Sequence, residues 1–428
     1  MLEKILDFGR TLIPASLFQT LQPVYHYLLA MFGAVFYLFP SRELTVIAVT
    51  GTKGKTSTVE LINAILEADG KITALAGTLR IKVAGDSQPN LFKMTIKGRF
   101  FLQRFLRRAV RAGCTHAIIE LTSEGAKQFR HKFIDLDALV FTNLAPEHIE
   151  SHGSYQKYLE AKLEIAKQLA KSKKLNKFIV VNGDDQEHEK FLQAVDGESQ
   201  VEKIIYKLTD AEPHYADDKS TELTIENSRI KTRLPGRFNL YNLLGAISLA
   251  RAYQVPVATI KTALESFAGI RGRMEPVGWQ EFDVLVDYAH TPDSLKAVYE
   301  TLNQRRKICV LGGTGGGRDH WKRPLMGQIA DDYCYRIILT DEDPYDEDPE
   351  KIVQEVASGI KSGNYEIVLD RREAIRKAVQ MAKKDDVVII TGKGTDPYIM
   401  GPKNTKTPWS DASVAHEELE KLKNARTA

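Results

Sequence analysis

The sequence predicts an α/β protein that contains two domains with parallel β-sheets. Three observations support this fold class. Short apolar, β-branched runs alternate with segments of helical periodicity from residue 44 onward. Polar side chains repeatedly follow the ends of these runs, which is typical of a parallel sheet with a site along one edge. The pattern begins anew after residues 269–272, which carry two glycines, so we place a domain boundary there.

The first 43 residues differ from the rest of the chain. Residues 24–39 are almost all apolar or aromatic and are bracketed by Pro23 and Pro40. A helix of this length spans about 24 Å, which is short of the ~30 Å hydrocarbon core of a bilayer. We therefore expect a short helical N-terminal segment. Three interpretations stay open: a helix docked on this protein, a dimer contact, or a helix that makes peripheral membrane contact through residues 14–40.

A glycine-rich loop follows the first predicted strand, residues 46–49. Residues 51–57 read Gly-Thr-Lys-Gly-Lys-Thr-Ser, and apolar residues at helical spacing come after them. Strand, glycine loop and helix are the architecture of a P-loop, in which backbone N–H groups and the helix N-terminus bind phosphate. Val49 stands where the strict motif has its first glycine, so this is a shorter form. We expect Lys55 to reach the outer phosphates and Thr56 to bind Mg²⁺.

Further strands complete the predicted central domain. The run 117–121 ends around Glu120, whose carboxylate can hold the Mg²⁺ that bridges nucleotide phosphates. The runs 139–141 and 178–181 also lead into polar residues, residues 200–234 suggest short β segments, and residues 236–251 suggest a helix.

The C-terminal part repeats the alternation of strand and helix as a second, Rossmann-like α/β unit. Its expected strands are residues 284–286, 308–311, 337–339, 367–369 and 387–390, and a helix is expected at 413–422. We therefore predict three parts: an apolar helical segment at 1–43, a central domain at 44–271 and a C-terminal domain at 272–428.

Composition narrows the classes of function. The 59 basic and 56 acidic side chains leave a net charge of +3, which gives no reason to expect a nucleic-acid partner. Cys114, Cys309 and Cys334 are widely spaced and predict neither a metal site nor a disulfide framework. Cys114 and Cys309 lie in apolar surroundings, so we expect buried thiols and a cytoplasmic location.

Two histidines and a lysine follow the third predicted strand. His148 and His152 lie just beyond it, and Lys162 follows on a predicted helix. A lysine ammonium has no lone pair and cannot ligate a metal. Carbamylation by CO₂ would convert Lys162 into an anion that can ligate Mg²⁺.

The ordered set of motifs resembles the Mur ligase family, and its order and spacing are similar to the MurE type, which adds the third amino acid of the peptidoglycan stem peptide. The resemblance covers about residues 44–415. The matching segments are residues 51–57, 141–144 with His148 and His152, 161–162, 236–239 with Asn242, 272–275, 287–292, 315–319, 322–327, 347–349, 370–371 and 392–394.

This resemblance implies a mechanism. ATP would phosphorylate a substrate carboxylate to an acyl phosphate, and an incoming amine would displace phosphate to form an amide. Glu120, His148 and a carbamylated Lys162 would hold Mg²⁺ together with Thr56, and site residues on two domains imply closure around ATP. The residues implied to bind the nucleotide are Gly51, Thr52, Lys53, Gly54, Lys55, Thr56, Ser57, Asn239, Asn242, Arg273, Asp287 and His290.

The resemblance also assigns residues to the two other substrates. Arg318 would grip the carboxylate of the incoming amino acid as a bidentate pair. The residues implied for the muropeptide-like carboxyl substrate are Thr95, Thr122, Ser123, Gln128 and Arg130, and those implied for the amino acid are Arg318, Glu342, Asp343, Pro344, Tyr345, Gly392 and Asp396.

The chain departs from the MurE pattern at both substrate sites. Only 43 residues precede the first strand, where the MurE type has a larger domain that holds the UDP-sugar. The Asp-Asn-Pro-Arg tetrad that selects diaminopimelate becomes residues 342–345, with Tyr345 in place of the arginine. The acids of this segment would instead favour a distal ammonium. These departures prompt the hypothesis that the ligase works beside the membrane, at its inner face, on a lipid-linked precursor.

Three other functions fit part of these motifs. Another ligase of the family, for polyglutamylation or for amidation of a lipid-linked precursor, would share the nucleotide motifs. A nicotinamide dehydrogenase would account for the glycines at 312–317, although Arg318 breaks its motif. A catalytically silent nucleotide-binding scaffold predicts lost metal ligands, yet Glu120, His148 and Lys162 are all present.

Overall fold

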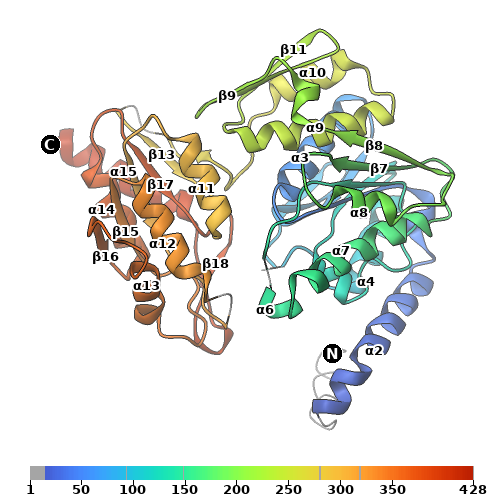
Figure 1. Cartoon of the computed structure of the whole chain (residues 1–428), viewed down its shortest axis with the longest axis horizontal. Coiled ribbons are helices and arrows are strands. Elements are labelled where there is room, and N and C mark those ends of the chain that lie inside the picture. Colours follow the sequence, from blue (N-terminus) through green and yellow to red (C-terminus); the bar gives the residue numbers. More distant parts are fainter. Residues whose placement is uncertain (1–14, 93, 148, 279–280, 318–319, 428) are drawn as a thin grey trace. The chain divides into compact units, whose positions relative to one another are not determined.

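The computed structural model describes residues 15–92, 94–147, 149–278, 281–317 and 320–427 (Figure 1). Its described residues form two compact units. Unit 1 comprises the residues up to 145 together with 155–207 and 245–255, and unit 2 comprises 146–154, 208–244 and 256–428. The three-part division at residues 44 and 272 stays a prediction.

Unit 1 is built on a sheet in which eight strands can be traced among the described residues, in the order β4-β3-β2-β5-β1-β6-β7-β8. The strands from β2 to β8 in this order are parallel, and β3 and β4 extend one edge antiparallel, so the predicted parallel sheet is confirmed. The strands are β1 (Thr45–Thr50), β2 (Thr73–Ala76), β3 (Arg80–Val83), β4 (Asp86–Pro89), β5 (His116–Glu120), β6 (Ala138–Phe141), β7 (Lys177–Asn182) and β8 (Val201–Tyr206).

Helices cover this sheet because its strands are apolar on both faces. Alternate residues of the strands, such as Ala48, Ile119 and Phe141, form one core with α4, α7 and α8. Parallel strands β1 and β5 pair with Val49 opposite Glu120, so the chain leaves both strands at the same edge. The helices of unit 1 are α2 (Ala15–Phe36), η1 (Pro40–Glu43), α3 (Lys55–Ala68), α4 (Arg99–Arg111), α5 (Ser123–Lys127), α7 (Tyr155–Ala170) and α8 (His188–Gln193).

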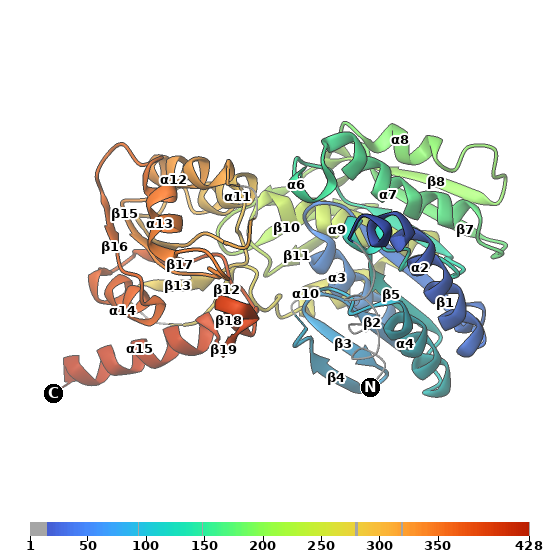
Figure 2. The ribbon, with the colours of Figure 1, turned by 90° about the horizontal axis from the view of Figure 1, so that it is seen from below.

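Unit 2 contains a second sheet, in the order β12-β13-β17-β14-β15-β16 over the described residues. All its strands except β12 are parallel. Helices α11, α12 and α13 cover one face of this sheet, and α14 and α15 cover the other (Figure 2). This arrangement confirms the predicted Rossmann-like layering. The strands are β12 (Glu275–Pro276), β13 (Asp283–Val286), β14 (Lys307–Leu311), β15 (Arg336–Leu339), β16 (Tyr365–Ile367) and β17 (Val387–Ile390).

Smaller elements complete unit 2. The segment expected to hold short β strands forms the antiparallel ladder β11-β10-β9, and β18 pairs with β19. Helix α9 begins in unit 2 and ends in unit 1. The remaining elements are α6 (Ile149–His152), η2 (Leu208–Ala211), β9 (Tyr215–Ala216), β10 (Thr221–Ile225), β11 (Ser228–Thr232), α9 (Arg237–Ala252), α10 (Val257–Ser266), α11 (Pro292–Thr301), α12 (Lys322–Tyr333), α13 (Pro349–Ala357), α14 (Arg371–Met381), β18 (Tyr398–Met400), η3 (Pro402–Asn404), β19 (Lys406–Pro408) and α15 (Asp411–Thr427).

Three expectations from the sequence are wrong. Cys309 is not a thiol but forms a disulfide with Cys334, because β14 lies beside the chain that enters β15 and brings the two Cα atoms to 6.1 Å. Helix α2 begins at Ala15 and contains Pro23 instead of starting after it. Strand β16 covers residues 365–367, two residues before the expected run, because its pairing with β15 fixes its position. Cys114 is a buried thiol, as expected.

Candidate functional site

The glycine loop lies at the carboxyl edge of the unit 1 sheet, between β1 and α3. Gly51 and Gly54 have φ values of 148° and 80°, in the region that favours glycine, and Gly54 is the residue before the first turn of α3. A Cβ on Gly51 would collide with the Thr142 hydroxyl. The amino end of α3 therefore opens at the loop with its N–H groups turned toward the space that a phosphate would fill.

The end of β6 holds this loop in shape. Asn143 accepts a hydrogen bond from the Lys53 backbone N–H at 2.9 Å through its side chain, and the Thr142 hydroxyl donates to the Lys53 carbonyl at 2.6 Å. The Lys55 ammonium donates to the Thr52 carbonyl at 2.9 Å. The structure therefore adds Thr142 and Asn143, whose place just past a predicted strand end was the signal in the sequence.

Glu120 faces the first turn of α3. Its carboxylate oxygens lie 3.2 and 3.4 Å from the Thr56 hydroxyl, and one of them accepts the backbone N–H of Thr78 at 2.9 Å. The carboxylate is almost fully buried. The structure thus brings together two predicted metal ligands, Thr56 and Glu120, and adds Thr78, which no pattern in the sequence singles out.

Lys162 projects from α7 toward the glycine loop. Its ammonium donates to the Gly51 carbonyl at 2.6 Å and lies 4.9 Å from the centre of the Tyr158 ring. The side chain is 1% exposed, so Lys162 is not a solvated surface lysine. The Tyr158 hydroxyl also lies 2.9 Å from the Thr52 hydroxyl, so one turn of α7 contacts the first two residues of the loop.

The residues predicted for the carboxyl substrate gather on neighbouring loops of unit 1. Thr95 shares a 2.9 Å hydrogen bond with Thr78, and Arg130 donates to the Ile96 carbonyl and to the Gln128 side chain. Thr122 caps α5 by accepting the Gly125 N–H, and Ser123 is buried beside it. Burial lowers the pKa of Arg130, because the charged guanidinium loses hydration.

The predicted nucleotide residues of unit 2 fall into two groups. Asp287 is buried and accepts the backbone N–H groups of Met274 and Ala289, while the Arg273 guanidinium lies 4.6 Å from the Tyr288 ring centre. The His290 ring packs edge-on against Tyr288 at 4.7 Å. Tyr288 is therefore an additional member of this group. The second group is on α9, where Asn242 donates to Asn239 and Asn239 donates to the Pro235 carbonyl.

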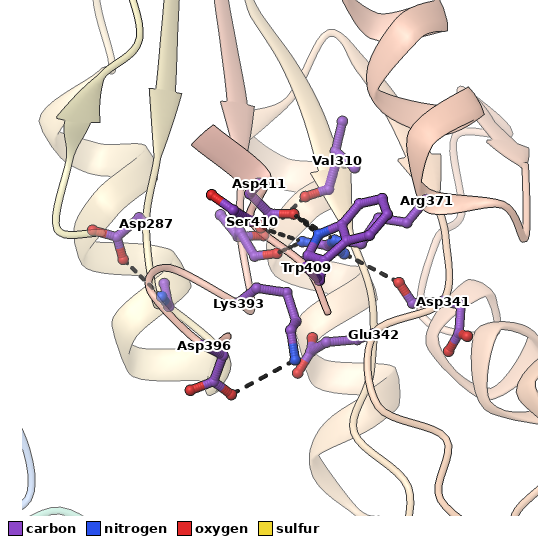
Figure 3. A network of polar contacts seen from close by, with 12 residues as sticks. Asp287, Val310, Asp341, Glu342, Arg371, Lys393, Asp396, Trp409, Ser410 and Asp411 are labelled. Carbon is purple, nitrogen blue, oxygen red and sulfur yellow. Dashed lines mark hydrogen bonds and ion pairs between the residues drawn. The ribbon is translucent and has the colours of Figure 1, made fainter. Parts of the chain in front are cut away.

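Buried acids form the centre of the predicted amino-acid site in unit 2. One oxygen of Glu342 accepts the Thr314 hydroxyl at 2.6 Å, and the other has no hydrogen-bond partner among the described residues. Asp343 accepts a hydrogen bond from the Lys393 ammonium at 2.8 Å. The same ammonium lies 3.6 Å from the Asp396 carboxylate (Figure 3). Gly392 is obligatory here, because a Cβ would overlap the unpartnered Glu342 oxygen. Pro344 and Tyr345 continue the segment, and Tyr345 donates its N–H to the Met400 carbonyl.

A buried arginine contacts the backbone at the start of this acidic segment. Arg371 makes two 2.8 Å hydrogen bonds to Asp411 and donates to the carbonyls of Asp341 and Thr391 (Figure 3). The pKa of Asp341 is raised to about 6, chiefly by burial and in smaller part by its acidic neighbours, while the Glu342 backbone N–H and Arg371 oppose the rise. The segment 341–343 is therefore rich in carboxylates whose charge is costly to bury, a setting that favours a bound cation.

Two predicted residues, His148 and Arg318, lie outside the described residues. His152 is described and is buried in the short helix α6. Within the described part of the chain, no group of three or more His, Cys, Asp or Glu side chains is arranged to hold a metal ion.

Comparisons with known proteins agree with this geometry. The Mur ligase middle domain matches residues 49–250, and the Mur ligase, glutamate ligase domain matches residues 272–394. The chain is 35% identical over 415 residues to the UDP-N-acetylmuramoyl-L-alanyl-D-glutamate--2,6-diaminopimelate ligase of Oceanobacillus iheyensis, covering 91% of this chain and 81% of that protein. It is 35% identical over 421 residues to the UDP-N-acetylmuramyl-tripeptide synthetase of Roseiflexus sp., covering 92% and 82%.

Solved structures show the same relationship. A UDP-N-acetylmuramoyl-L-alanyl-D-glutamate--2,6-diaminopimelate ligase superposes with a TM-score of 0.61 at 30% identity, covering 89% of this chain and 79% of that one. A folylpolyglutamate synthase from Mycobacterium tuberculosis, with a TM-score of 0.67 and 16% identity over 85% of this chain and 91% of its own, shares the fold.

The chain therefore belongs to the Mur ligase family, a class of ATP-dependent, ADP-forming ligases. Within this family it is MurE-like, since the relatives at 35% identity over most of its length carry MurE-type names. The expected fold class and family are thus confirmed.

Proposed function

We propose that this protein uses ATP and Mg²⁺ to activate a substrate carboxylate as an acyl phosphate and joins it to the amine of an amino acid. The γ-phosphoryl group passes to the carboxylate and ADP leaves. The amine then attacks the acyl carbon, phosphate leaves with its bonding electrons, and the amine loses a proton. The observation that supports this most is the glycine loop at the amino end of α3, with Thr56, Glu120 and Lys162 directed at it.

The residues around Thr56 fit a magnesium ion. A buried carboxylate and a hydroxyl, 3.2 Å apart beside a phosphate-binding loop, are the hard oxygen ligands that Mg²⁺ prefers. The Thr78 N–H orients Glu120 from the opposite side. When bound, Mg²⁺ would offset the charge of the nucleotide phosphates as they approach the carboxylate. His148 is the further ligand that the family resemblance implies.

Lys162 is proposed to carry a carbamate formed with CO₂. Its amine is enclosed by Gly51 and Tyr158, at the loop itself, where an ammonium would repel a metal ion. A carbamate would supply anionic oxygens at the same place. The chain's own contribution is positioning, because Tyr158 and the Gly51 carbonyl fix the side chain and exclude water from its end.

The other assigned residues are proposed to bind the remaining parts of the substrates. Asn239, Asn242, Arg273, Asp287 and His290 would contact the nucleotide beyond its phosphates. The group around Thr95 and Arg130 would hold the carboxyl substrate, which by similarity to the named relatives is a muropeptide-like precursor of peptidoglycan. Such a role would place the protein in cell-wall synthesis, and through it in cell shape and division.

The amine site is proposed to accept an amino acid with a second amine. Glu342 presents one buried oxygen without a partner, and Asp341 and Asp343 lie on either side of it in the sequence. An incoming ammonium would supply the missing hydrogen bond. Tyr345, in place of the family arginine, leaves a distal carboxylate without a cation to pair with at this position. Arg318 would bind the α-carboxylate.

The protein is also proposed to work in the cytoplasm at the inner face of the membrane, with peripheral contact through residues 14–40. In the described part of the chain, no helix combines the length and apolar character that crossing a bilayer requires. Contact would therefore be made by a helix lying on the surface. A lipid-linked acceptor would be within reach from that position.

Phosphate release tests the proposed reaction. It should be measured against the standard amino acids and diaminopimelate, with UDP-linked and lipid-linked acceptors. We expect release that depends on ATP, Mg²⁺ and an amino acid with a distal amine. Phosphate release that occurs without an amino acid would contradict a ligase. So would the absence of phosphate release with every combination of amino acid and acceptor.

Substitution of Lys162 tests the carbamate separately. Lys162→Ala should abolish turnover, and short carboxylates such as formate or acetate should restore part of it by occupying the place of the carbamate. Lys167→Ala, on the same helix but half-exposed and paired with Glu164, should remain active. Near-normal activity of Lys162→Ala without rescue would remove this lysine from the mechanism.

A further inference from the structure

One side of α2 exposes an uninterrupted apolar surface. The 22 residues of this helix include no Asp, Glu, Lys or Arg. The residues of the exposed side, which we term the α2 face, are large and apolar or aromatic although each is about 40–65% accessible to solvent. They are Val24 56%, Tyr27 43%, Leu28 50%, Met31 39%, Phe32 59%, Val35 52% and Phe36 64%. Large exposed apolar patches of this kind mark interaction surfaces.

The opposite side of α2 is fixed to unit 1. Ala30 and Ala34 are buried, and Gly33 lies against Phe100 of α4. Arg107 of α4 donates to the carbonyls of Tyr37 and Leu38 at 3.0 and 3.1 Å, just past the end of α2. These hydrogen bonds satisfy carbonyl groups that the end of the helix leaves open. Helix α2 therefore lies along α4 with its apolar face turned outward.

Helix α4, which packs on the covered side of α2, carries positive charge. Residues 93–111 contain seven Lys or Arg residues and no Asp or Glu. Phe100, Gln103 and Arg107 form the side of α4 that contacts α2. At helical spacing, Arg104, Arg108 and Arg111 follow on the adjoining side and are exposed, and we term them the arginine row. Its one ion pair among the described residues is Arg108 with the exposed Asp86 at 3.6 Å.

We propose that the α2 face and the arginine row together form a binding surface for a bilayer that contains anionic lipids. The apolar side chains enter the boundary between head groups and acyl chains, and the arginines pair with lipid phosphates. This inference rests on the membrane contact proposed above and adds the class of lipid that is recognised. Apolar burial supplies most of the affinity, and the arginine row supplies the preference for negative charge.

The charge distribution favours a bilayer over a second copy of the chain. In a symmetric dimer the same patch meets itself, so two α2 faces in contact would bring two arginine rows close together. The exposed arginines would then repel each other, because Asp86 is the one acid paired with the row among the described residues. An anionic bilayer satisfies the apolar and the basic parts of the surface at once.

Vesicle flotation tests the proposal with the full-length protein. The vesicles are phosphatidylcholine alone, or phosphatidylcholine with an equal part of phosphatidylglycerol. We expect strong flotation with the anionic vesicles, weak flotation with the neutral ones, and loss of the difference at high salt. Arg104→Gln/Arg108→Gln/Arg111→Gln should weaken anionic binding by about fivefold for each arginine, or on the order of a hundredfold in all.

Matched variants make the result specific. Lys171→Gln/Lys190→Gln/Lys203→Gln removes three exposed cations near the β7–β8 edge of the same sheet and should bind like the wild type. Phe32→Ser should reduce binding to both kinds of vesicle. Its unfolding midpoint should stay close to that of the wild type, because Phe32 is 59% exposed.

The outcomes separate the two proposals. Equal binding to neutral and anionic vesicles, unchanged in the arginine variant, would overturn the lipid preference and leave the membrane contact. Absence of binding to either vesicle would overturn both. A dimer in light scattering that Phe32→Ser dissociates, without vesicle binding, would assign the α2 face to a second copy. Ligase activity with a water-soluble acceptor should be unchanged in these variants. This measurement is the control that separates weaker lipid binding from general damage to the protein.

Discussion

Replacing Glu120 with glutamine tests the magnesium site most directly. The carboxylate accepts the Thr78 N–H at 2.9 Å and lies 3.2 Å from the Thr56 hydroxyl. Glutamine has nearly the same volume, so its amide oxygen can keep the bond from Thr78 while its NH₂ group turns to the Thr56 oxygen. Glu120→Gln therefore removes one negative charge and changes little else.

The expected effect on folding is small. A hydrogen bond to a charged group contributes about 1 kcal/mol more than a neutral one, so the variant loses on the order of 1 kcal/mol. In a domain of this size such a loss lowers the unfolding midpoint by about 2–4 °C. Thermal unfolding in the absence of Mg²⁺ measures this effect alone.

The expected effect on Mg²⁺ is large. A unit charge about 4 Å from a cation is worth ~4 kcal/mol at an effective dielectric constant of ~20. Desolvation of the buried carboxylate offsets part of this. If about 1.4–2.8 kcal/mol remains, the Mg²⁺ concentration for half-maximal phosphate release should rise about 10- to 100-fold.

A magnesium titration of phosphate release at saturating ATP provides the assay. Glu189→Gln, which removes an exposed acid from α8, is the control and should titrate like the wild type. An unchanged magnesium midpoint in Glu120→Gln would refute the assignment of this carboxylate as a ligand. A large fall in the unfolding midpoint would show that Glu120 is chiefly structural.

Three further predictions concern other buried groups. Glu342→Gln should raise the KM for an amino acid with a distal amine about 10- to 100-fold, because a charged hydrogen bond is worth about 1.5–3 kcal/mol. The KM for ATP should be unchanged. An amino-acid KM equal to that of the wild type in steady-state kinetics would exclude this contact. Burial lowers the pKa of His131 to about 3, so the folded state binds fewer protons than the unfolded one and stability falls as the pH drops below about 6.5. The loss in the free energy of unfolding amounts to ~2 kcal/mol at pH 5 relative to pH 8, and His131→Leu should remove it. Unfolding curves at the two pH values measure this, and a variant that differs from the wild type by the same amount at pH 5 and pH 8 would contradict the prediction. Asp411→Asn leaves the Arg371 charge buried without its partner and should destabilise unit 2 by about 3–5 kcal/mol, whereas Glu417→Gln, in an exposed pair, should cost less than about 1 kcal/mol in chemical unfolding, and similar losses would refute the difference.

Local patterns were sufficient to predict much of the fold. The strands β1, β5, β6 and β7 of unit 1 and β13, β14, β15 and β17 of unit 2 follow from apolar runs of three to five residues that lead into polar side chains. A buried parallel strand needs such a run, so its position shows in the sequence. The glycine loop is visible for the same kind of reason, because its backbone geometry needs glycine at Gly51 and Gly54.

Contacts between distant segments were not visible in the same way. Thr78 and Tyr158 belong to the site because β2 and α7 bring them to Glu120 and to the loop. Neither stands in a motif that predicts a role. Cys309 and Cys334 are 25 residues apart, and no spacing rule pairs them. They meet because β14 and β15 are neighbours in the sheet.

The sequence by itself determined the family, the two parallel sheets and the residue types around the phosphate loop, because each depends on short-range pattern and on backbone conformations that few residues allow. Only the tertiary structure decided which of those residues meet, which acid of the proposed amine site has an oxygen without a partner, and which side of α2 faces outward. The sequence shows that residues of α2 are apolar all around the helix. The contacts of Gly33 with Phe100 and of Arg107 with the Tyr37 carbonyl determine which side is covered.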